Sequence, residues 1–398
     1  MAHLRNRYLK SQLQNALKFS PLVGVLGQRQ VGKTTLIEAI TSSSNYVTFD
    51  EENVRTSASL KPKGFLEGFS SLTAIDECQK VPEIFPALKL FVQKNKKPGQ
   101  FILSGSVRFT SRKAIQESLT GRLYNLELLP LTLAETHHLP FLDYNLLFNK
   151  NFEKVISDLS ERRKILNSSN IEKYIEHGGL PGICFLRDPS HRANKLKSHI
   201  ETLLQRDIFL IIKTTASYSS LFGLLTYLAE NQGQAFSLKH CSTQCRLAQN
   251  TVKKLIDAYE ALFLIRRVPG FGFRSAPLFF LEDQGMAHYL MTHKKEHFVY
   301  RFLFSQVFSN VHYTHPSKYQ IGYHEYKSGS RIDLVAKLDT GNIAFFYEDA
   351  EAVSTKNIHL ADNYIKEFPN AKVILLTEAD KAIKLAANII SLPVHWIA

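Results

Sequence analysis

The stretch PLVGVLGQRQVGKTTLIEAI, residues 21–40, decides the fold of the N-terminal part of the chain. The apolar run at 22–26 predicts a buried strand, and apolar residues continue at helical spacing from Leu36 to Ile40. Between them, residues 27–34 match GxxxxGKT at every fixed position. This is the strand, loop and helix order that a phosphate-binding loop requires.

The residue types in this loop are those that hold a phosphate chain. Gly27 and Gly32 allow successive backbone N–H groups to point at phosphate oxygens, and the new helix presents its positive end to the same anion. Lys33 adds a point charge for the β- and γ-phosphates, and the Thr34 hydroxyl is a ligand for Mg²⁺. The alternative, an ordinary glycine-rich turn, leaves the flanking strand and helix unexplained. The residues expected to bind the nucleotide are Gly27, Gln28, Arg29, Gln30, Val31, Gly32, Lys33, Thr34 and Thr35.

Two adjacent acids close the apolar strand in SLTAIDECQKVP, residues 71–82. We expect Asp76 to hold Mg²⁺ through water, and Glu77 to orient and deprotonate the attacking water as the general base. The alternative is a solvent-facing acid pair at the end of a strand. The intact phosphate loop upstream favours the metal and base roles.

Small hydroxyl residues and an arginine complete the predicted site. GQFILSGSVRF, residues 99–109, ends in serines, so Ser106 or Ser104 is expected to contact the γ-phosphate and position the water. Either serine also suits a strand cap. Arg122 precedes a predicted strand at 123–128 and is expected to stabilise charge in the transition state, in its own or a neighbouring subunit. The alternative for Arg122 is an ordinary surface arginine.

Length and composition limit the class of protein. A chain of 398 residues predicts two or three domains, and 44% hydrophobic with 21% charged residues is typical of a soluble globular protein. No apolar run approaches the ~20 residues of a membrane helix, and the basic start lacks the apolar core of a secretory signal. We therefore expect no membrane contact and a cytoplasmic location. Four cysteines without a CxxC pair favour neither a disulfide framework nor a zinc site.

The chain carries a formal net charge of +13 and a pI near 9.4. Such an excess of Lys and Arg favours polyanionic partners through counterion release. Much of it is equally consistent with ordinary solvated surface. Charge alone therefore only weakly indicates nucleic acid binding.

Several segments resemble a large group of bacterial and archaeal AAA+ ATPases that have a characteristic helical C-terminal region. They are GQRQVGKTT, IDECQKVPEIFPALK, FILSGS, SLTGRLYNLELLPLTLAE and YIEHGGLPG. The resemblance covers most of the chain, and residues 75–88 and 178–181 are its most specific parts. It implies a five-stranded parallel sheet with helices on both faces, ATP as the nucleotide, and Arg122 as an arginine finger or sensor. It supplies no substrate. Similar archaeal ATPases join such a motor to a winged helix and a nuclease-like tail.

The region from 219 to 268 predicts three helices and a strand. Within it, TVKKLIDAYEALFLI resembles the recognition helix of a winged helix-turn-helix. A protein-interaction or lid module is the alternative, because the same fold serves both roles. The residues expected to contact DNA are Asn250, Thr251, Lys253 and Lys254.

Two further segments match elements of the family. SHIETLLQRDIFLI, residues 198–211, predicts a helix that ends at the adjacent Arg206 and Asp207. The family has a matching Arg–Asp pair there, for which a structural ion pair suits the residues as well as a catalytic role. Residues 276–290 resemble the family's strand-then-helix element, which carries Asp283.

The last hundred residues resemble a restriction-type nuclease fold, in which Asp and Glu-x-Lys bind Mg²⁺ and activate water. Asp333 matches the Asp and Glu348 the Glu, but Ala350 stands in the lysine position. We therefore expect a degenerate domain that does not cleave. Lys356 in the missing role has no support in the pattern. Glu325 is a candidate to complete a carboxylate cluster, for which an acid at the edge of a hairpin is the simpler alternative.

These features predict an α/β chain in three parts: an AAA+-like P-loop ATPase domain at 1–165, a helical and winged helix-turn-helix region at 166–295, and a nuclease-like α/β domain at 296–398. The expected function is Mg²⁺-dependent hydrolysis of ATP, with the nucleotide state controlling contacts of the basic C-terminal half, including contacts with DNA. An Arg122 acting from a neighbour would require self-association. Two alternatives stay open: a DNA-binding regulator that uses ATP as a slow switch, and a Mg²⁺-dependent nuclease.

Overall fold

The computed structural model describes residues 4–41, 45–108, 119, 121–148, 156–157, 159–160, 165–273, 276–293, 298–315 and 319–398. The chain forms two compact units, each assembled from three separate segments. Unit 1 consists of Met1–Leu131, Leu180–Tyr218 and Lys254–Leu264, and unit 2 of Thr132–Gly179, Ser219–Lys253 and Ile265–Ala398. The units do not follow linear order along the chain, so the boundaries at 165 and 295 stay a prediction.

Unit 1 is built on a five-stranded parallel sheet in the order β2-β3-β4-β1-β5. The strands are β1 (Leu22–Leu26), β2 (Tyr46–Thr48), β3 (Thr73–Asp76), β4 (Phe101–Gly105) and β5 (Leu123–Glu127). The three central strands β3, β4 and β1 are buried along their whole length, as expected for a parallel sheet covered on its faces. The predicted five-stranded α/β sheet is confirmed.

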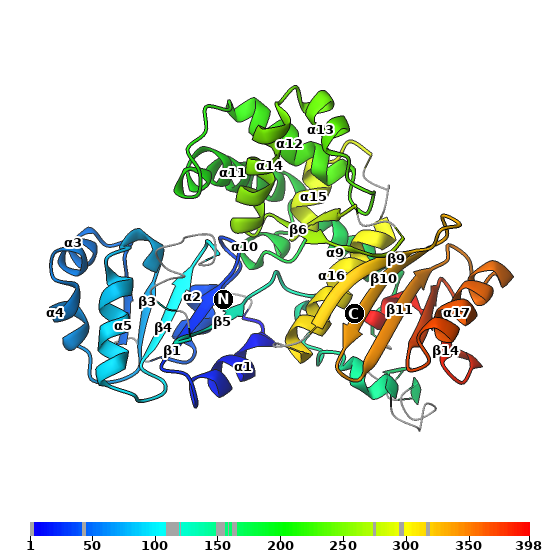
Figure 1. The fold of residues 1–398 in the computed structure, drawn as a ribbon, viewed down its shortest axis with the longest axis horizontal. Helices are drawn as coiled ribbons and strands as arrows, with labels where there is room; N and C mark the ends of the chain where they lie inside the picture. Colours follow the sequence, from blue (N-terminus) through cyan, green and yellow to red (C-terminus); the bar gives the residue numbers. More distant parts are fainter. Residues whose placement is uncertain are drawn as a thin grey trace. The chain divides into compact units, whose positions relative to one another are not determined.

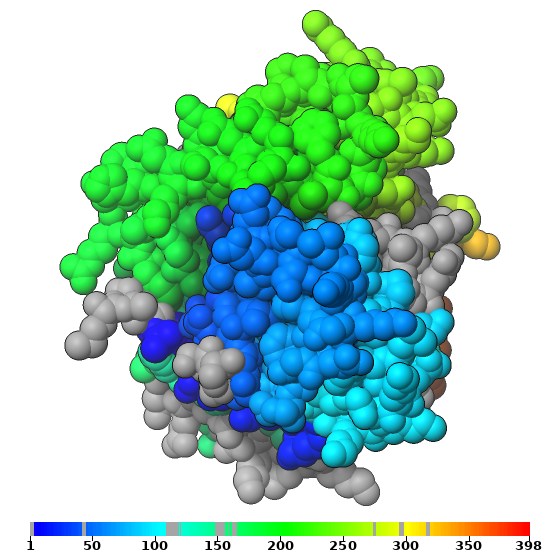
Figure 2. All heavy atoms as spheres, turned by 90° about the vertical axis from the view of Figure 1, so that its left-hand side faces the viewer, coloured from blue at the N-terminus to red at the C-terminus, as the bar shows by residue number. Residues whose placement is uncertain are grey.

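Helices α3 to α5 pack together against the sheet (Figure 1). Their apolar residues, among them Leu66, Phe85 and Leu88, form one core with Ile75 and Phe101 of the strands. Figure 2 shows the outer surface of this part of unit 1, in blue to cyan. Among the described residues of unit 1 before 131, the helices are α1 (Leu9–Ala16), α2 (Lys33–Glu38), α3 (Glu52–Leu60), α4 (Pro62–Glu67), the 3₁₀ turn η2 (Cys78–Lys80) and α5 (Ile84–Lys94).

The parallel pairing gathers three loops at one edge of the sheet. Strands β1, β3 and β4 all run in the same direction, so the segments that follow Leu26, Asp76 and Gly105 leave from the same edge. In open parallel sheets this carboxyl edge is where ligands bind. The second segment of unit 1 adds α10 (Pro181–Cys184), α11 (Pro189–Gln205) and η5 (Asp207–Leu210).

Unit 2 contains a seven-stranded mixed sheet in the order β13-β14-β12-β11-β10-β9-β7. Strands β9, β10 and β11 pair antiparallel, whereas β11, β12 and β14 pair parallel. Ala361 and Tyr364 of α17 are buried against this sheet. The strands are β7 (Gly270–Gly272), β9 (Tyr319–Glu325), β10 (Arg331–Leu338), β11 (Gly341–Tyr347), β12 (Lys372–Thr377), β13 (Ile383–Ala386) and β14 (Ile389–Pro393).

A separate two-stranded ladder joins β6 (Ile265–Val268) to β8 (Leu278–Leu281). The remaining elements are α7 (Leu133–Thr136), η4 (Tyr144–Phe148), α9 (Ser168–His177), α12 (Tyr218–Glu230), α13 (Leu238–Cys245), α14 (Gln249–Ala261), α15 (Gln284–Leu290), α16 (Phe298–Thr314), α17 (Thr355–Glu367) and η6 (Val394–Ile397). Nowhere in the described ranges does a helix combine the length and apolar character needed to cross a membrane.

The local predictions for the middle of the chain agree with these elements. Helices α12, α13 and α14 followed by β6 reproduce the three helices and strand predicted for 219–268, and β8 with α15 reproduces the strand and helix at 276–290. The helix predicted at 198–211 is instead the end of the longer α11 followed by η5. Of the linking helices predicted at 136–170, residues 149–155, 158 and 161–164 lie outside the described residues.

Candidate functional site

The loop between β1 and α2 has the backbone shape that its glycines allow. Gly32 caps α2 with φ +97°, a left-handed conformation that other residues rarely adopt. A Cβ added to Gly27 would lie 2.3 Å from the Leu128 carbonyl oxygen. Both positions therefore need glycine, and the loop can curl in front of the helix N-terminus.

Lys33 and Gln28 leave polar groups buried inside this loop. The Lys33 side chain is 6% exposed, and its Nζ donates to the carbonyl oxygens of Gly27 at 2.9 Å and Gln28 at 3.0 Å. Burial lowers the pKa of Lys33 to about 8, against the raising effect of Glu77 and Asp76. The amide nitrogen and oxygen of Gln28 are buried without a hydrogen-bond partner among the described residues. Carbonyls do not neutralise an ammonium, so the loop fits an anionic ligand.

Asp76 lies at the centre of the site. Its Oδ2 accepts hydrogen bonds from Thr34 Oγ1 at 2.9 Å and the Tyr46 hydroxyl at 2.5 Å, and its Oδ1 from Ser104 Oγ at 2.5 Å and the Glu77 amide at 2.9 Å. Burial alone would raise the pKa of Asp76, but these four donors outweigh it and the pKa is lowered. Asp76 is therefore held as a carboxylate.

The Thr34 and Asp76 oxygens suit Mg²⁺. This ion usually keeps several waters and takes one or two protein oxygens beside phosphate. A hydroxyl and a carboxylate 2.9 Å apart at the end of the phosphate loop match that donor set. Within the described ranges, no group of three or more His, Cys, Asp and Glu side chains is placed so that it could hold a metal ion.

Glu77 has a strained backbone and a shifted pKa. Its φ of 52° places it in the left-handed region, which few non-glycine residues adopt and which is enriched at functional sites. Burial raises its pKa, although the Lys33 charge acts in the opposite direction. Gln79 Nε2 donates to Glu77 Oε2 at 2.5 Å and lies 3.4 Å from Ser106 Oγ. The two predicted serines thus differ: Ser104 binds Asp76, whereas Ser106 lies beside the Gln79 amide that holds Glu77.

The structure does not bring Arg122 to the phosphate loop of its own chain. Arg122 immediately precedes β5, whose first residue Leu123 pairs with Leu22 at the start of β1. The phosphate loop begins after Leu26, at the other end of β1. At about 3.3 Å per residue, Leu26 lies about 13 Å along the strand from Leu22. Arg122 therefore lies at the opposite edge of the sheet, and of its two predicted modes only action on a neighbouring chain is compatible with this register.

Sequence reasoning missed Tyr46 and Gln79. Gln79 could have been considered, because it follows the predicted base Glu77 by only two residues. Nothing in the sequence around Tyr46 indicates that its hydroxyl contacts the carboxylate of Asp76, 30 residues later. Arg108, also missed, forms a bidentate pair with Glu127 at 2.9 and 3.2 Å on the carboxyl edge.

The Arg–Asp pair predicted at the end of α11 contacts the phosphate loop. Asp207 Oδ1 accepts from Arg206 Nε at 2.8 Å, and Asp207 Oδ2 lies 3.8 Å from Arg29 Nη1. A Cβ added to Gly32 would lie 3.6 Å from Pro181 Cγ. The segment from α10 to η5 therefore lies against the loop at two points.

The residues predicted to contact DNA lie on α14. Asn250, Lys253 and Lys254 are exposed, and Thr251 is half-buried. The four side chains therefore occupy an accessible stretch near the N-terminus of this helix.

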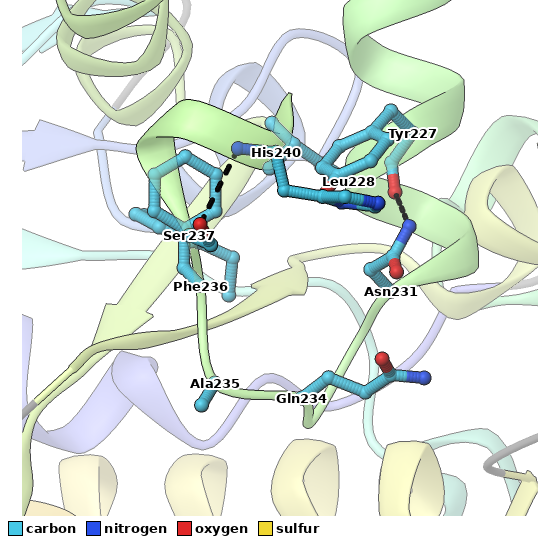
Figure 3. Close-up of a pocket in the computed structure, with 9 residues that line it drawn as sticks. Tyr227, Leu228, Asn231, Gln234, Ala235, Phe236, Ser237 and His240 are labelled. Atoms are coloured by element: carbon cyan, nitrogen blue, oxygen red, sulfur yellow. Dashed lines mark hydrogen bonds between the residues drawn. The ribbon is translucent and has the colours of Figure 1, made fainter. Parts of the chain in front are cut away.

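A small pocket lies in the helical part of unit 2 (Figure 3). It has a volume of about 100 Å³. Two of its lining residues, Tyr227 of α12 and His240 of α13, form a hydrogen bond between the hydroxyl and Nδ1 at 2.8 Å. Ligand pockets usually measure about 300–1,000 Å³, so this one is too small for a nucleotide. Cys241 and Cys245 of α13 lie 4.0 Å apart as free thiols.

The predicted nuclease residues are held by separate hydrogen bonds. Asp333 accepts from the Tyr300 hydroxyl and, at 2.9 Å, from the Tyr347 amide. Glu348 follows β11 after the predicted hairpin and accepts from the Ser354 amide at 2.8 Å, at the start of α17. Ala350 lies in the bend that follows, Lys356 in the first turn of α17, and the buried Glu325 at the end of β9.

Comparison with known proteins gives two family matches. Residues 20–137 match the model of a family described as an AAA domain, and residues 168–296 match one described as a domain of unknown function. Uncharacterized proteins of Mycobacterium tuberculosis and Mycobacterium bovis are each 28% identical over 296 residues, 72% of this chain. The chain spans 60% of the length of these relatives. A Walker-type ATPase of Pyrococcus abyssi is 13% identical, covering 71% of this chain and 94% of its own, with a TM-score of 0.39 that supports no functional argument.

Tyr46→Phe is expected to raise the pKa of Asp76, because it removes one of the hydrogen bonds that stabilise the carboxylate. The measurement is a ¹³C NMR titration of the aspartate carboxyl carbons in wild type and variant. Tyr124→Phe is the matched control, since that ring packs on Phe19 at 5.1 Å and should leave Asp76 unchanged. An identical Asp76 pKa in Tyr46→Phe and wild type would contradict the hydrogen-bond set described above.

Proposed function

We propose that this chain, whose residues 20–137 match the model of an AAA domain and contain the five-stranded parallel sheet, binds ATP with Mg²⁺ and hydrolyses it. The observation that carries the proposal is the single cluster of Lys33, Thr34, Asp76 and Glu77 at the carboxyl edge of the sheet. The phosphate loop, a pair of oxygens suited to Mg²⁺ and a candidate general base lie together there. Bound Mg²⁺ supplies positive charge to the phosphate oxygens during transfer.

Each residue of the cluster has a physical role in this proposal. The buried Lys33 ammonium attracts the phosphate chain, and the glycine-shaped loop donates its amides to it. Thr34 and Asp76 hold the metal ion, with Asp76 kept ionised by its four donors. Glu77 accepts a proton from water, and its raised pKa makes it a stronger base than an ordinary glutamate. Gln79 orients the Glu77 carboxylate, and Ser106 lies next to Gln79.

The remaining predicted catalytic residue requires a second copy of the chain. Arg122 lies on the sheet edge opposite the loop, so it would stabilise transition-state charge only in a neighbouring subunit. In this proposal, self-association brings the two together. The rival function is a slow ATP switch without turnover. It would use the same nucleotide-binding residues as the proposed ATPase but would not need Glu77 as a base.

Glu77→Gln is expected to bind Mg·ATP like wild type and to hydrolyse it about a hundredfold or more slowly, because it removes the general base. The measurements are phosphate release and calorimetric binding on the same preparations. Glu83→Gln, at the start of α5, removes the same charge nearby and should keep the wild-type rate. If wild type and Glu77→Gln both bind ATP and are equally idle, the slow switch is favoured, whereas equal and appreciable rates would contradict Glu77 as the general base.

We further propose that the exposed face of α14 contacts DNA. Lys253 and Lys254 are exposed, Asn250 is exposed beside them, and the chain carries a net charge of +13. Phosphate contacts from such lysines would give salt-dependent binding. Cleavage is not proposed, because Ala350 stands where the nuclease pattern has the lysine that helps to activate water.

Lys253→Ala/Lys254→Ala is expected to weaken binding to duplex DNA and to reduce the slope of log K against log salt by about one for each lost phosphate contact. Fluorescence anisotropy at several salt concentrations measures both. Lys61→Ala/Lys63→Ala, which removes the same charge from exposed residues around the start of α4, is the control. An equal loss in the two double variants would show that only overall charge matters.

A further inference from the structure

His199 is a buried polar side chain without a partner. It lies on α11, is 2% exposed, and neither of its ring nitrogens has a hydrogen-bond partner in the described part of the chain. Buried polar groups in native proteins are almost always hydrogen-bonded, and one that is not loses its hydration without compensation. An isolated histidine in such a place suggests that a ligand supplies the missing partner.

The phosphate loop lies next to the part of unit 1 that carries His199. Asp207, directly after α11, lies 3.8 Å from the guanidinium of Arg29 in the loop, and Pro181 lies beside Gly32. His199 shares the buried face of α11 with Leu196 and Leu203. The loop therefore approaches this part of the chain on both sides of His199, before α11 at Pro181 and after it at Asp207.

The charged side chains of the loop act electrostatically on His199. Burial and the nearby cations Arg29 and Lys33 lower the pKa of His199 to about 4. The ring is therefore neutral at pH 7, with one nitrogen carrying a hydrogen and the other free to accept. The two loop cations that act electrostatically on the ring, together with its unpaired N–H, are groups that suit a polyphosphate.

Arg29 is held only loosely in this arrangement. Asp207 Oδ1 accepts a hydrogen bond from Arg206 Nε at 2.8 Å, whereas Asp207 Oδ2 lies 3.8 Å from Arg29 Nη1 without a hydrogen bond. The Arg29 side chain is 31% exposed. An anion entering the loop can therefore compete for Arg29 without breaking a close ion pair.

We propose that His199 binds the phosphate chain of the nucleotide held by Lys33, by donating its ring N–H to a phosphate oxygen. The inference rests on the proposed function and extends it. The contact satisfies the buried ring only when nucleotide is bound, and it attaches α11 to the nucleotide. In this way the nucleotide state reaches the segment from α10 to η5, which already lies against the phosphate loop at Gly32 and Arg29.

The test compares His199→Leu with wild type, using the full chain and Mg·AMP-PNP. Leucine fills the space but cannot donate, so the Kd measured by calorimetry should rise about tenfold, the cost of losing a hydrogen bond to a charged group. The thermal unfolding midpoint without nucleotide should not fall, because an unsatisfied polar group has been removed. His199→Gln keeps an N–H donor and should recover part of the affinity.

Leu196→Ala, one turn away on the same buried face, is the control for packing. It should lower the unfolding midpoint without nucleotide and leave the Kd within about twofold. A His199→Leu variant that binds AMP-PNP as tightly as wild type overturns the inference and leaves the proposed function intact. A wild-type chain that binds no nucleotide overturns both.

A second measurement does not depend on the leucine variant folding. The ¹⁵N signals of the histidine rings can be followed in wild type, with the His199 signal identified by its loss in His199→Gln. That signal should move when Mg·AMP-PNP is added. An unchanged His199 signal at saturating nucleotide overturns the inference.

Discussion

One buried carboxylate holds the site together. The side chain of Asp76 accepts four hydrogen bonds, from residues on α2, on β2, on β4 and from the amide that follows β3. A buried carboxylate without partners would be very unfavourable, so the four donors and the carboxylate require one another. Because the donors come from a helix, two strands and the residue after a third strand, the same interaction sets the relative positions of these elements at the carboxyl edge.

The pKa values of two neighbouring carboxyl groups in the site are shifted in opposite directions. The pKa of Asp76 is lowered by its donors, whereas the pKa of Glu77, the next residue, is raised by burial. Two carboxylates whose environments separate their pKa values in this way are suited to different tasks, one to bind a cation and the other to exchange a proton. Lys33 lies within the electrostatic reach of both, and their charges limit the fall of its own pKa.

The sequence predicted the parts of the site that are contiguous along the chain. The phosphate loop, the acid pair after β3 and the parallel sheet follow from local patterns of glycine, charge and apolar residues, and the structure has the same strands. Tyr46 could not be predicted as a site residue, because only the folded chain brings its hydroxyl to Asp76. Asp207 could be singled out together with Arg206, but its approach to Arg29 of the loop could not be predicted. Arg122 shows the opposite case: its motif suggested a role at the loop, but strand register places it at the other edge.

Binding of Mg·ATP to wild type and Lys33→Ala at pH 7 and pH 9 tests the central claim most directly. The pKa of Lys33 is about 8 in the free protein, and a bound polyanion raises it, so binding above pH 8 must take up a proton. We predict that wild type binds, that its affinity falls between pH 7 and pH 9, and that Lys33→Ala binds at least about tenfold more weakly with no such fall. Equal affinities for the two proteins at both pH values would contradict the account.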